Sequence, residues 1–149
     1  MNDTPNPNQV FSRAKAAHDA GNVTEAEPLY KQLLDIAPGH PDVLHLLGVL
    51  YGQTGRFDDA IKAIGNAIAK VPGDPNYHYN YGNVLLQMKR WDEAATAFGR
   101  SLKIAPKNPD AAFNLGLVLK QGGRLDDAEQ AFRRVISLNA DHADALAEL

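Results

Sequence analysis

Residues 75–108 read PNYHYNYGNVLLQMKRWDEAATAFGRSLKIAPKN, and variants of this stretch precede and follow it at a spacing of 34 residues. Glycine shows the period at Gly48, Gly82 and Gly116. Proline shows it twice, at Pro7, Pro41, Pro75 and Pro109 and again at Pro38, Pro72 and Pro106. Because seven of the nine prolines fall on two positions of one period, the sequence is a tandem array, and a period of this length is typical of repeat architectures.

The spacing divides the chain into repeats that follow one another without insertion or deletion. We expect a loose N-terminal tail over residues 1–6. The four repeats that follow span residues 7–40, 41–74, 75–108 and 109–142. Residues 143–149 are expected to begin a fifth repeat or to form a partial capping helix.

Each repeat carries start and stop signals for two helices. Proline at the first position suits the first turn of a helix, where its missing N–H costs nothing. Glycine at Gly21, Gly55 and Gly123 suits the left-handed residue that ends a helix, whereas the third repeat carries Lys89 there. Acidic pairs such as Asp58-Asp59 then suit the N-terminus of the second helix. The sequence therefore predicts helix–turn–helix repeats.

Apolar residues three and four positions apart predict a buried stripe on the second helices, such as Ala94, Phe98 and Ser101. Glycine and alanine at fixed positions of the two helices predict a close crossing, with Ala94 near Gly82. Neighbouring repeats must stack to complete the core, because one helix pair cannot bury all of its apolar surface.

Composition excludes several functional classes. The chain has 149 residues, a net charge of -3 and no cysteine, so disulfides and thiolate chemistry are absent. Acidic and basic residues are interleaved, which argues against binding to nucleic acid or to an anionic membrane. The N-terminus shows no signal peptide, and no apolar run approaches the ~20 residues of a membrane span. We expect a soluble, cytoplasmic protein.

The segments LHLLGVLYGQTGRFDDAIKAIGNAIAKVP and AFNLGLVLKQGGRLDDAEQAFRRVI resemble the tetratricopeptide repeat, and the likeness extends over residues 7–142. This resemblance implies an all-α fold, a right-handed α-solenoid whose first helices line a concave groove. The first repeat departs from the pattern, with Arg13 in place of leucine and Ala17 in place of tyrosine. Its polar first helix is expected to be an N-terminal cap.

No motif for catalysis or metal binding is present. The five histidines lack the spacing of a zinc site, and His40 and His142 occupy the same position in the loop between repeats. The acidic pairs recur at helix N-termini, which favours capping over acid–base catalysis. We therefore expect a protein that is not an enzyme and needs no metal or cofactor.

The face of the first helices that is turned away from the packing stripe is the candidate binding surface. Its fifth position in each repeat holds an aromatic ring or an imidazole, and amides lie beside these rings. Amides bind a peptide backbone without reading its sequence, and rings seat its side chains. The predicted contact residues are Phe11, Lys15, His45, Leu46, Val49, Tyr79, Asn80, Asn83, Phe113, Asn114, Leu117 and Gln121. The alternative for Phe11 and Phe113 is packing between neighbouring first helices.

Family resemblance also bears on the ligand. Repeats that clamp a carboxylate resemble one another in placing lysine and arginine at set positions of this face. Those positions hold Phe11, Asn76 and Asn80 here, or His45, Asp110 and Asn114 in the next register. Carboxylate clamping is therefore not expected. Asn80 and Asn114 instead resemble the asparagine ladder in the repeat arm of O-linked N-acetylglucosamine transferases.

Three hypotheses follow. The leading one is a non-catalytic interaction module or scaffold that binds a peptide segment of a partner protein in the concave groove. The second is a substrate-recruiting arm of a larger enzyme, such as a glycosyltransferase, because the fifth repeat stops after seven residues. The third is self-association through the open C-terminal end.

Overall fold

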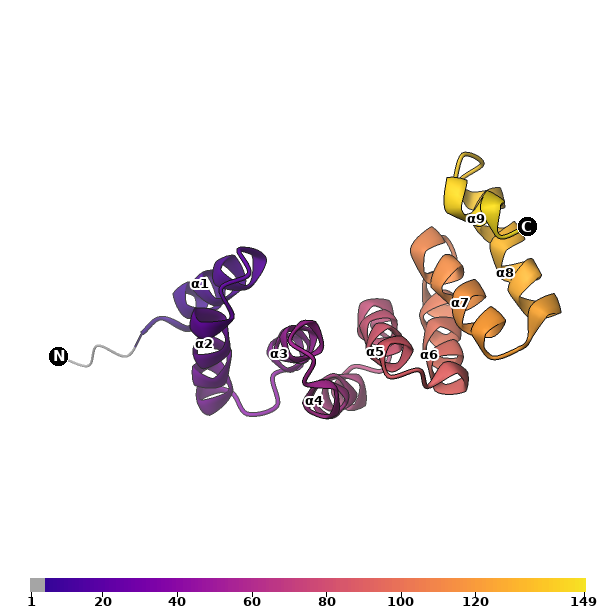
Figure 1. The fold of residues 1–149 in the computed structure, drawn as a ribbon. Helices are drawn as coiled ribbons and strands as arrows, with labels where there is room; N and C mark the ends of the chain where they lie inside the picture. Colours follow the sequence, from indigo (N-terminus) through magenta and orange to yellow (C-terminus); the bar gives the residue numbers. More distant parts are fainter. Residues whose placement is uncertain (1–4) are drawn as a thin grey trace. The chain divides into compact units, whose positions relative to one another are not determined.

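The computed structural model describes residues 5–149 and shows α-helices joined by short turns (Figure 1). Of the predicted tail over residues 1–6, residues 1–4 lie outside the described part of the chain. The helices are α1 Pro7–Asp19, α2 Val23–Ile36, α3 Pro41–Gln53, α4 Phe57–Lys70, α5 Pro75–Gln87, α6 Trp91–Ile104, α7 Pro109–Gln121, α8 Leu125–Leu138 and α9 Ala143–Ala147. Each predicted repeat contains one pair of consecutive helices, and the all-α helix–turn–helix prediction is confirmed.

The helices fall into two compact units, one that ends at Pro72 and one that begins at Gly73. The first unit contains α1 to α4, in which α1 packs on α2, α2 on α3 and α3 on α4. The second contains α5 to α9, in which each helix likewise packs on the next. No helix in residues 5–149 has both the length and the apolar character that crossing a bilayer requires.

Proline begins the first helix of every pair, as predicted. Pro7, Pro41, Pro75 and Pro109 are the first residues of α1, α3, α5 and α7. Before α1, α5 and α7, the side chain that precedes the helix accepts a hydrogen bond from a first-turn N–H group. Asn6 accepts from the backbone N–H of Asn8, Asp74 from that of Asn76 and Asn108 from that of Ala111.

A left-handed residue lies in the turn between the two helices of each pair. Gly21, Gly55 and Gly123 have φ of 73°, 78° and 79°. Lys89 takes the same conformation with φ of 59°, although its Cβ disfavours it. The turn geometry is therefore kept in the third repeat at a cost in backbone strain.

The second helices bury the predicted stripes. Ala94, Phe98 and Ser101 of α6 have no exposed surface. The Ser101 hydroxyl donates a hydrogen bond of 2.9 Å to the carbonyl oxygen of Pro75, which satisfies this buried polar group and ties α6 to the start of α5.

Glycine in the first helices allows the two helices of a pair to cross closely. A Cβ atom built on Gly82 would lie 2.8 Å from the ring of Phe98, its nearest neighbour across the crossing. A Cβ on Gly116 would likewise lie 2.5 Å from the ring of Phe132. Glycine is needed here because a large side chain of the second helix fills the space.

The two ends of the chain have different character. In α1 the buried residues are small, namely Val10, Ala14 and Ala17, and Arg13 is exposed and pairs with Glu25 at 3.0 Å. In α9 Ala145 is fully buried, whereas Leu146 and Leu149 at this end remain 50% and 53% exposed.

Candidate peptide-binding surface

The surface formed by α5 and α7 in the second unit carries a cluster of three predicted contact residues. The Asn114 side-chain amide donates to the Asn83 carbonyl oxygen at 3.0 Å and to the Tyr79 hydroxyl oxygen at 3.4 Å. Asn83 and Tyr79 lie one turn apart on α5, and Asn114 projects from α7. The fold therefore brings together side chains that are 31 and 35 residues apart. We call Tyr79, Asn83 and Asn114 the amide cluster.

The amide cluster retains free hydrogen-bonding groups. Both N–H bonds of the Asn114 side chain are used within the cluster, so its carbonyl oxygen remains as an acceptor. The side-chain nitrogen of Asn83 and the hydroxyl hydrogen of Tyr79 remain as donors within the described part of the chain. A donor and an acceptor side by side match the N–H and C=O groups of a peptide backbone.

The aromatic rings of the predicted surface pack on the second helix of their own repeat. The ring of Tyr79 lies 5.8 Å from that of Phe98, and the ring of Phe113 lies 5.7 Å from that of Phe132. Phe113 also lies 5.0 Å from the imidazole of His142. Both Tyr79 and Phe113 are half-buried, so packing fixes each ring while part of its surface stays accessible.

The other predicted residues of the second unit differ in exposure. Asn80 on α5 and Leu117 on α7 are half-buried, and Gln121 at the end of α7 is exposed.

In the first unit the predicted residues lie on α1 and α3. His45, Leu46 and Val49 are half-buried on α3. Lys15 is exposed on α1, where its ammonium group pairs with Asp19 of the next turn at 3.1 Å. Phe11 is half-buried, and together with Leu33, Ile36 and Val43 it lines a cavity of about 240 Å³ between α1, α2 and the start of α3.

A histidine that the sequence did not single out connects α1 to its neighbours. Nδ1 of His18 lies 3.0 Å from the Tyr30 hydroxyl of α2, and Nε2 lies 2.9 Å from the Gln53 side-chain oxygen of α3. With Gln53 as acceptor, Nε2 carries the hydrogen, and Tyr30 donates to Nδ1. Burial, aided by the charge of Asp19, raises the pKa of Tyr30 to about 12.

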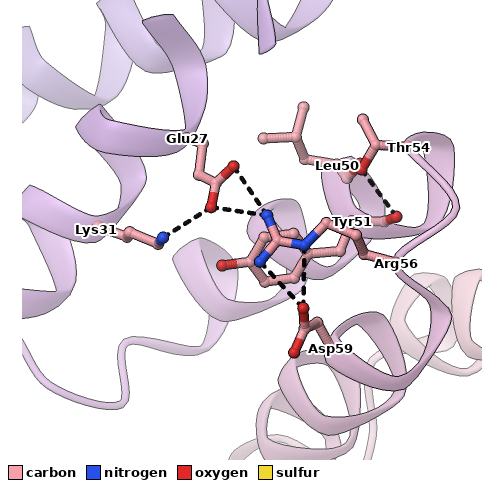
Figure 2. Close-up of polar contacts among 7 residues, drawn as sticks. All are labelled: Glu27, Lys31, Leu50, Tyr51, Thr54, Arg56 and Asp59. Atoms are coloured by element: carbon pink, nitrogen blue, oxygen red, sulfur yellow. Dashed lines mark hydrogen bonds and ion pairs between the residues drawn. The ribbon is translucent and has the colours of Figure 1, made fainter. Parts of the chain in front are cut away.

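A second network, also missed in the sequence, links α2 to the turn before α4 (Figure 2). The guanidinium of Arg56 donates to both carboxylate oxygens of Glu27, at 2.9 and 3.1 Å, and pairs with Asp59 at 3.0 Å. It also lies 4.1 Å from the centre of the Tyr51 ring, a cation–π distance. Lys31 pairs with Glu27 from the other side at 2.7 Å. Arg56 therefore joins the first repeat to the second.

The contacts of Lys31 and Arg56 favour the ionised form of Glu27. Hydrogen bonds from Lys31 and from Arg56 hold the pKa of Glu27 below its usual value, although partial burial acts in the opposite direction. The hydrogen bond to Glu27 in turn raises the pKa of Arg56. A sequence signal for part of this network existed, because Arg56, Arg90 and Arg124 recur at the 34-residue spacing. Glutamate does not recur in the same way, because the repeat position of Glu27 is occupied by Ile61 in the second repeat and by Ala95 in the third.

Comparison with protein families agrees with the helix–turn–helix repeats seen in the structure. A family model described as a tetratricopeptide repeat matches residues 17–81 and residues 85–149. The comparison with curated proteins gave no match.

Solved structures share the fold. A crystal structure of MamA is 24% identical, with a TM-score of 0.85 over 91% of this chain and 79% of that chain. YrrB, described as a TPR protein with an unusual peptide-binding site, is 21% identical, with a TM-score of 0.81 over 91% of this chain and 70% of that chain. An O-GlcNAc transferase mutant of Thermobaculum terrenum is 33% identical, with a TM-score of 0.72 over 76% of this chain and 22% of that chain.

Proposed function

The chain belongs to the tetratricopeptide repeat family, and on that premise we propose that it is a non-catalytic module that binds an extended segment of a partner protein along its first helices. Within the second unit, the residues proposed to contact this segment are Tyr79, Asn80, Asn83, Phe113, Asn114, Leu117 and Gln121.

The amide cluster is the observation that carries this proposal. Asn114 is held by two hydrogen bonds to residues of the neighbouring first helix, so its free carbonyl oxygen has a fixed direction. A fixed acceptor beside a free donor binds a backbone amide with little loss of side-chain entropy, and this favours affinity. The cluster carries no charge, which supports recognition of a peptide backbone over a terminal carboxylate or a phosphate. The similarity in fold to YrrB, whose description mentions a peptide-binding site, is consistent with this function.

A peptide selection with matched variants tests the proposal. Random peptides displayed on phage are selected against the wild-type protein, and the selected peptide is titrated by calorimetry. We expect Asn83→Ala combined with Asn114→Ala to weaken binding by about tenfold or more, because each lost hydrogen bond costs ~1 kcal/mol. Asn66→Ala on the exposed surface of α4 is the control and should bind like the wild type. Undiminished binding by the folded double variant would contradict the proposal.

A second candidate function is a substrate-recruiting arm of a glycosyltransferase. The similarity to the Thermobaculum terrenum O-GlcNAc transferase supports it, since the aligned region is 33% identical. The coding sequence downstream of residue 149 decides between the two. An open frame that continues into a catalytic domain favours the arm, and a stop codon at this point contradicts it.

A further inference from the structure

The second unit carries a groove between α6 and α8, and its lining includes none of the residues of the amide cluster. It encloses about 450 Å³, within the ~300–1,000 Å³ typical of ligand pockets. Its lining includes the apolar side chains of Leu115 and Leu119 of α7 and Leu102 of α6. Alanines at 95 and 131, one on each bordering helix, leave the groove open. We call this site the outer groove.

Gly99 lies on α6 between Ala95 and Leu102, two residues that line the outer groove. Residues 95, 99 and 102 lie on one helical stripe, because they are separated by four and three positions. A Cβ atom at Gly99 would meet no atom within 4 Å, so no packing contact within the chain requires glycine there. Glycine within a helix costs ~1 kcal/mol relative to alanine. The space above Gly99 would admit a close approach by another polypeptide.

One end of the outer groove is basic and partly apolar. Residues 99–108 contain three cations and residues 130–140 contain two, and neither segment contains Asp or Glu. Arg134, at the groove, donates to the carbonyl oxygen of Pro106 at 2.8 Å, which places the C-terminal ends of α6 and α8 side by side. Ile104 and Leu138 at these ends are 40% and 37% exposed.

The opposite end of the outer groove is neutral. Arg124 pairs there with Asp127 at 2.8 Å, so neither charge is left uncompensated. Positive charge is therefore concentrated at the end that holds Arg134, and Lys103 directly follows the lining residue Leu102 in α6. This charge favours an acidic ligand.

We propose that the outer groove binds an acidic segment of a partner protein, with leucine-like side chains between α6 and α8 and carboxylates at Lys103 and Arg134. This site is separate from the amide cluster, and it does not depend on the function proposed above.

Nuclear magnetic resonance with a defined probe tests the proposal. The probe is a short acetylated peptide in which pairs of leucine alternate with pairs of glutamate, and its control replaces glutamate with lysine. We expect the acidic peptide to shift the methyl resonances of Leu102, Leu115 and Leu119, and the lysine peptide to leave them unchanged. Shifts confined to Tyr79, Asn83 and Asn114 would overturn the proposal, as would the absence of shifts.

Variants then separate binding from folding. Arg134→Glu should weaken binding of the acidic peptide by about tenfold. The adjacent Arg133→Glu is the matched control, because Arg133 pairs with Glu129 of its own helix, and it should have little effect. Gly99→Leu should raise the thermal unfolding midpoint and yet weaken binding, a combination that a purely structural role of Gly99 would not produce.

Other ligands give different outcomes. Equal losses from Arg133→Glu and Arg134→Glu, or binding to phosphatidylserine vesicles without binding of the peptide, would overturn the proposal in favour of general attraction to anions. A mass that rises with protein concentration and falls with Gly99→Leu would assign the groove to a second copy of the chain and would overturn it as well.

Discussion

Lys89 occupies a backbone conformation that the other three repeats assign to glycine. Its φ of 59° brings the Cβ atom close to the following carbonyl oxygen. We expect Lys89→Gly to raise the free energy of unfolding by about 1 kcal/mol, since the strain relieved exceeds the added entropy of the unfolded chain. The reverse change, Gly123→Lys, should lower it by a similar amount. Urea denaturation measures both, and equal stability of Lys89→Gly and the wild type would contradict the prediction.

Gly82 and Gly99 make a contrasting pair, because both lie inside helices but in different surroundings. Gly82→Ala forces a Cβ atom against Phe98 and should lower the free energy of unfolding by ~1–3 kcal/mol. Gly99→Ala meets no such contact and should raise it by ~1 kcal/mol, the difference in helix propensity. Chemical denaturation should show that the two substitutions change the free energy of unfolding in opposite directions. A destabilised Gly99→Ala variant would show that something other than helix propensity acts at this position.

At the scale of helices, Glu27 tests whether Arg56 holds α2 to the second repeat. Glu27→Gln removes the charge that Arg56 and Lys31 contact, and we expect the thermal midpoint at pH 7 to fall by about 1–3 °C. Because the pKa of Glu27 is lowered in the folded state, this stabilisation is present above its usual pKa of 4.5. This stabilisation is lost as the pH falls through the lowered pKa of Glu27. The thermal midpoints of the wild type and the variant should therefore converge at acidic pH.

Glu129→Gln is a matched control for Glu27→Gln. Glu129 holds the same repeat position and pairs with Arg133 one turn later, as Glu27 pairs with Lys31. Within residues 5–149, Arg133 is the only ion-pair partner of this carboxylate, so the change should move the midpoint by less than about 1 °C. If both substitutions lower the midpoint equally, Arg56 does not hold the two repeats together.

The helices could be predicted from the sequence because their signals are local. Proline fixes φ at a helix start, and glycine accepts the positive φ of the turn, so both act whatever lies around them. The contacts of single side chains were harder to predict. The atoms nearest to a Cβ at Gly82 belong to the ring of Phe98, and the repeat spacing did not single out this ring as the neighbour.

At the scale of the whole molecule, the candidate site was predictable as a set of positions but not as a set of contacts. Repeat spacing put Tyr79 and Asn114 on equivalent helices, and it could not show that Asn114 would donate to Tyr79. The Glu27–Arg56 pair lies outside any periodic rule, because only one repeat interface has both partners and the Tyr51 ring. Such contacts depend on rotamers and on the angle between repeats, neither of which is encoded in a spacing.

Stability is expected to vary along the chain. Helix α1 buries only small side chains, Val10, Ala14 and Ala17, whereas α3 buries larger ones, among them Leu47 and Leu50. We therefore expect amide hydrogens of α1 to exchange about tenfold faster than those of α3, because local opening exposes less apolar surface. Hydrogen exchange followed by mass spectrometry measures this difference. Equal protection of the two helices would contradict it.

The reach of Arg56 to Glu27 limits how far these repeats can serve as interchangeable building blocks. An engineer who places the second repeat behind a copy of itself or behind the third repeat would put Arg56 next to a helix with isoleucine or alanine where Glu27 now stands, whereas the fourth repeat offers Glu129 there. The turn would keep its shape, and the guanidinium would lose its bidentate carboxylate. Modules with near-identical backbones would then assemble in a preferred order, set by one acidic side chain.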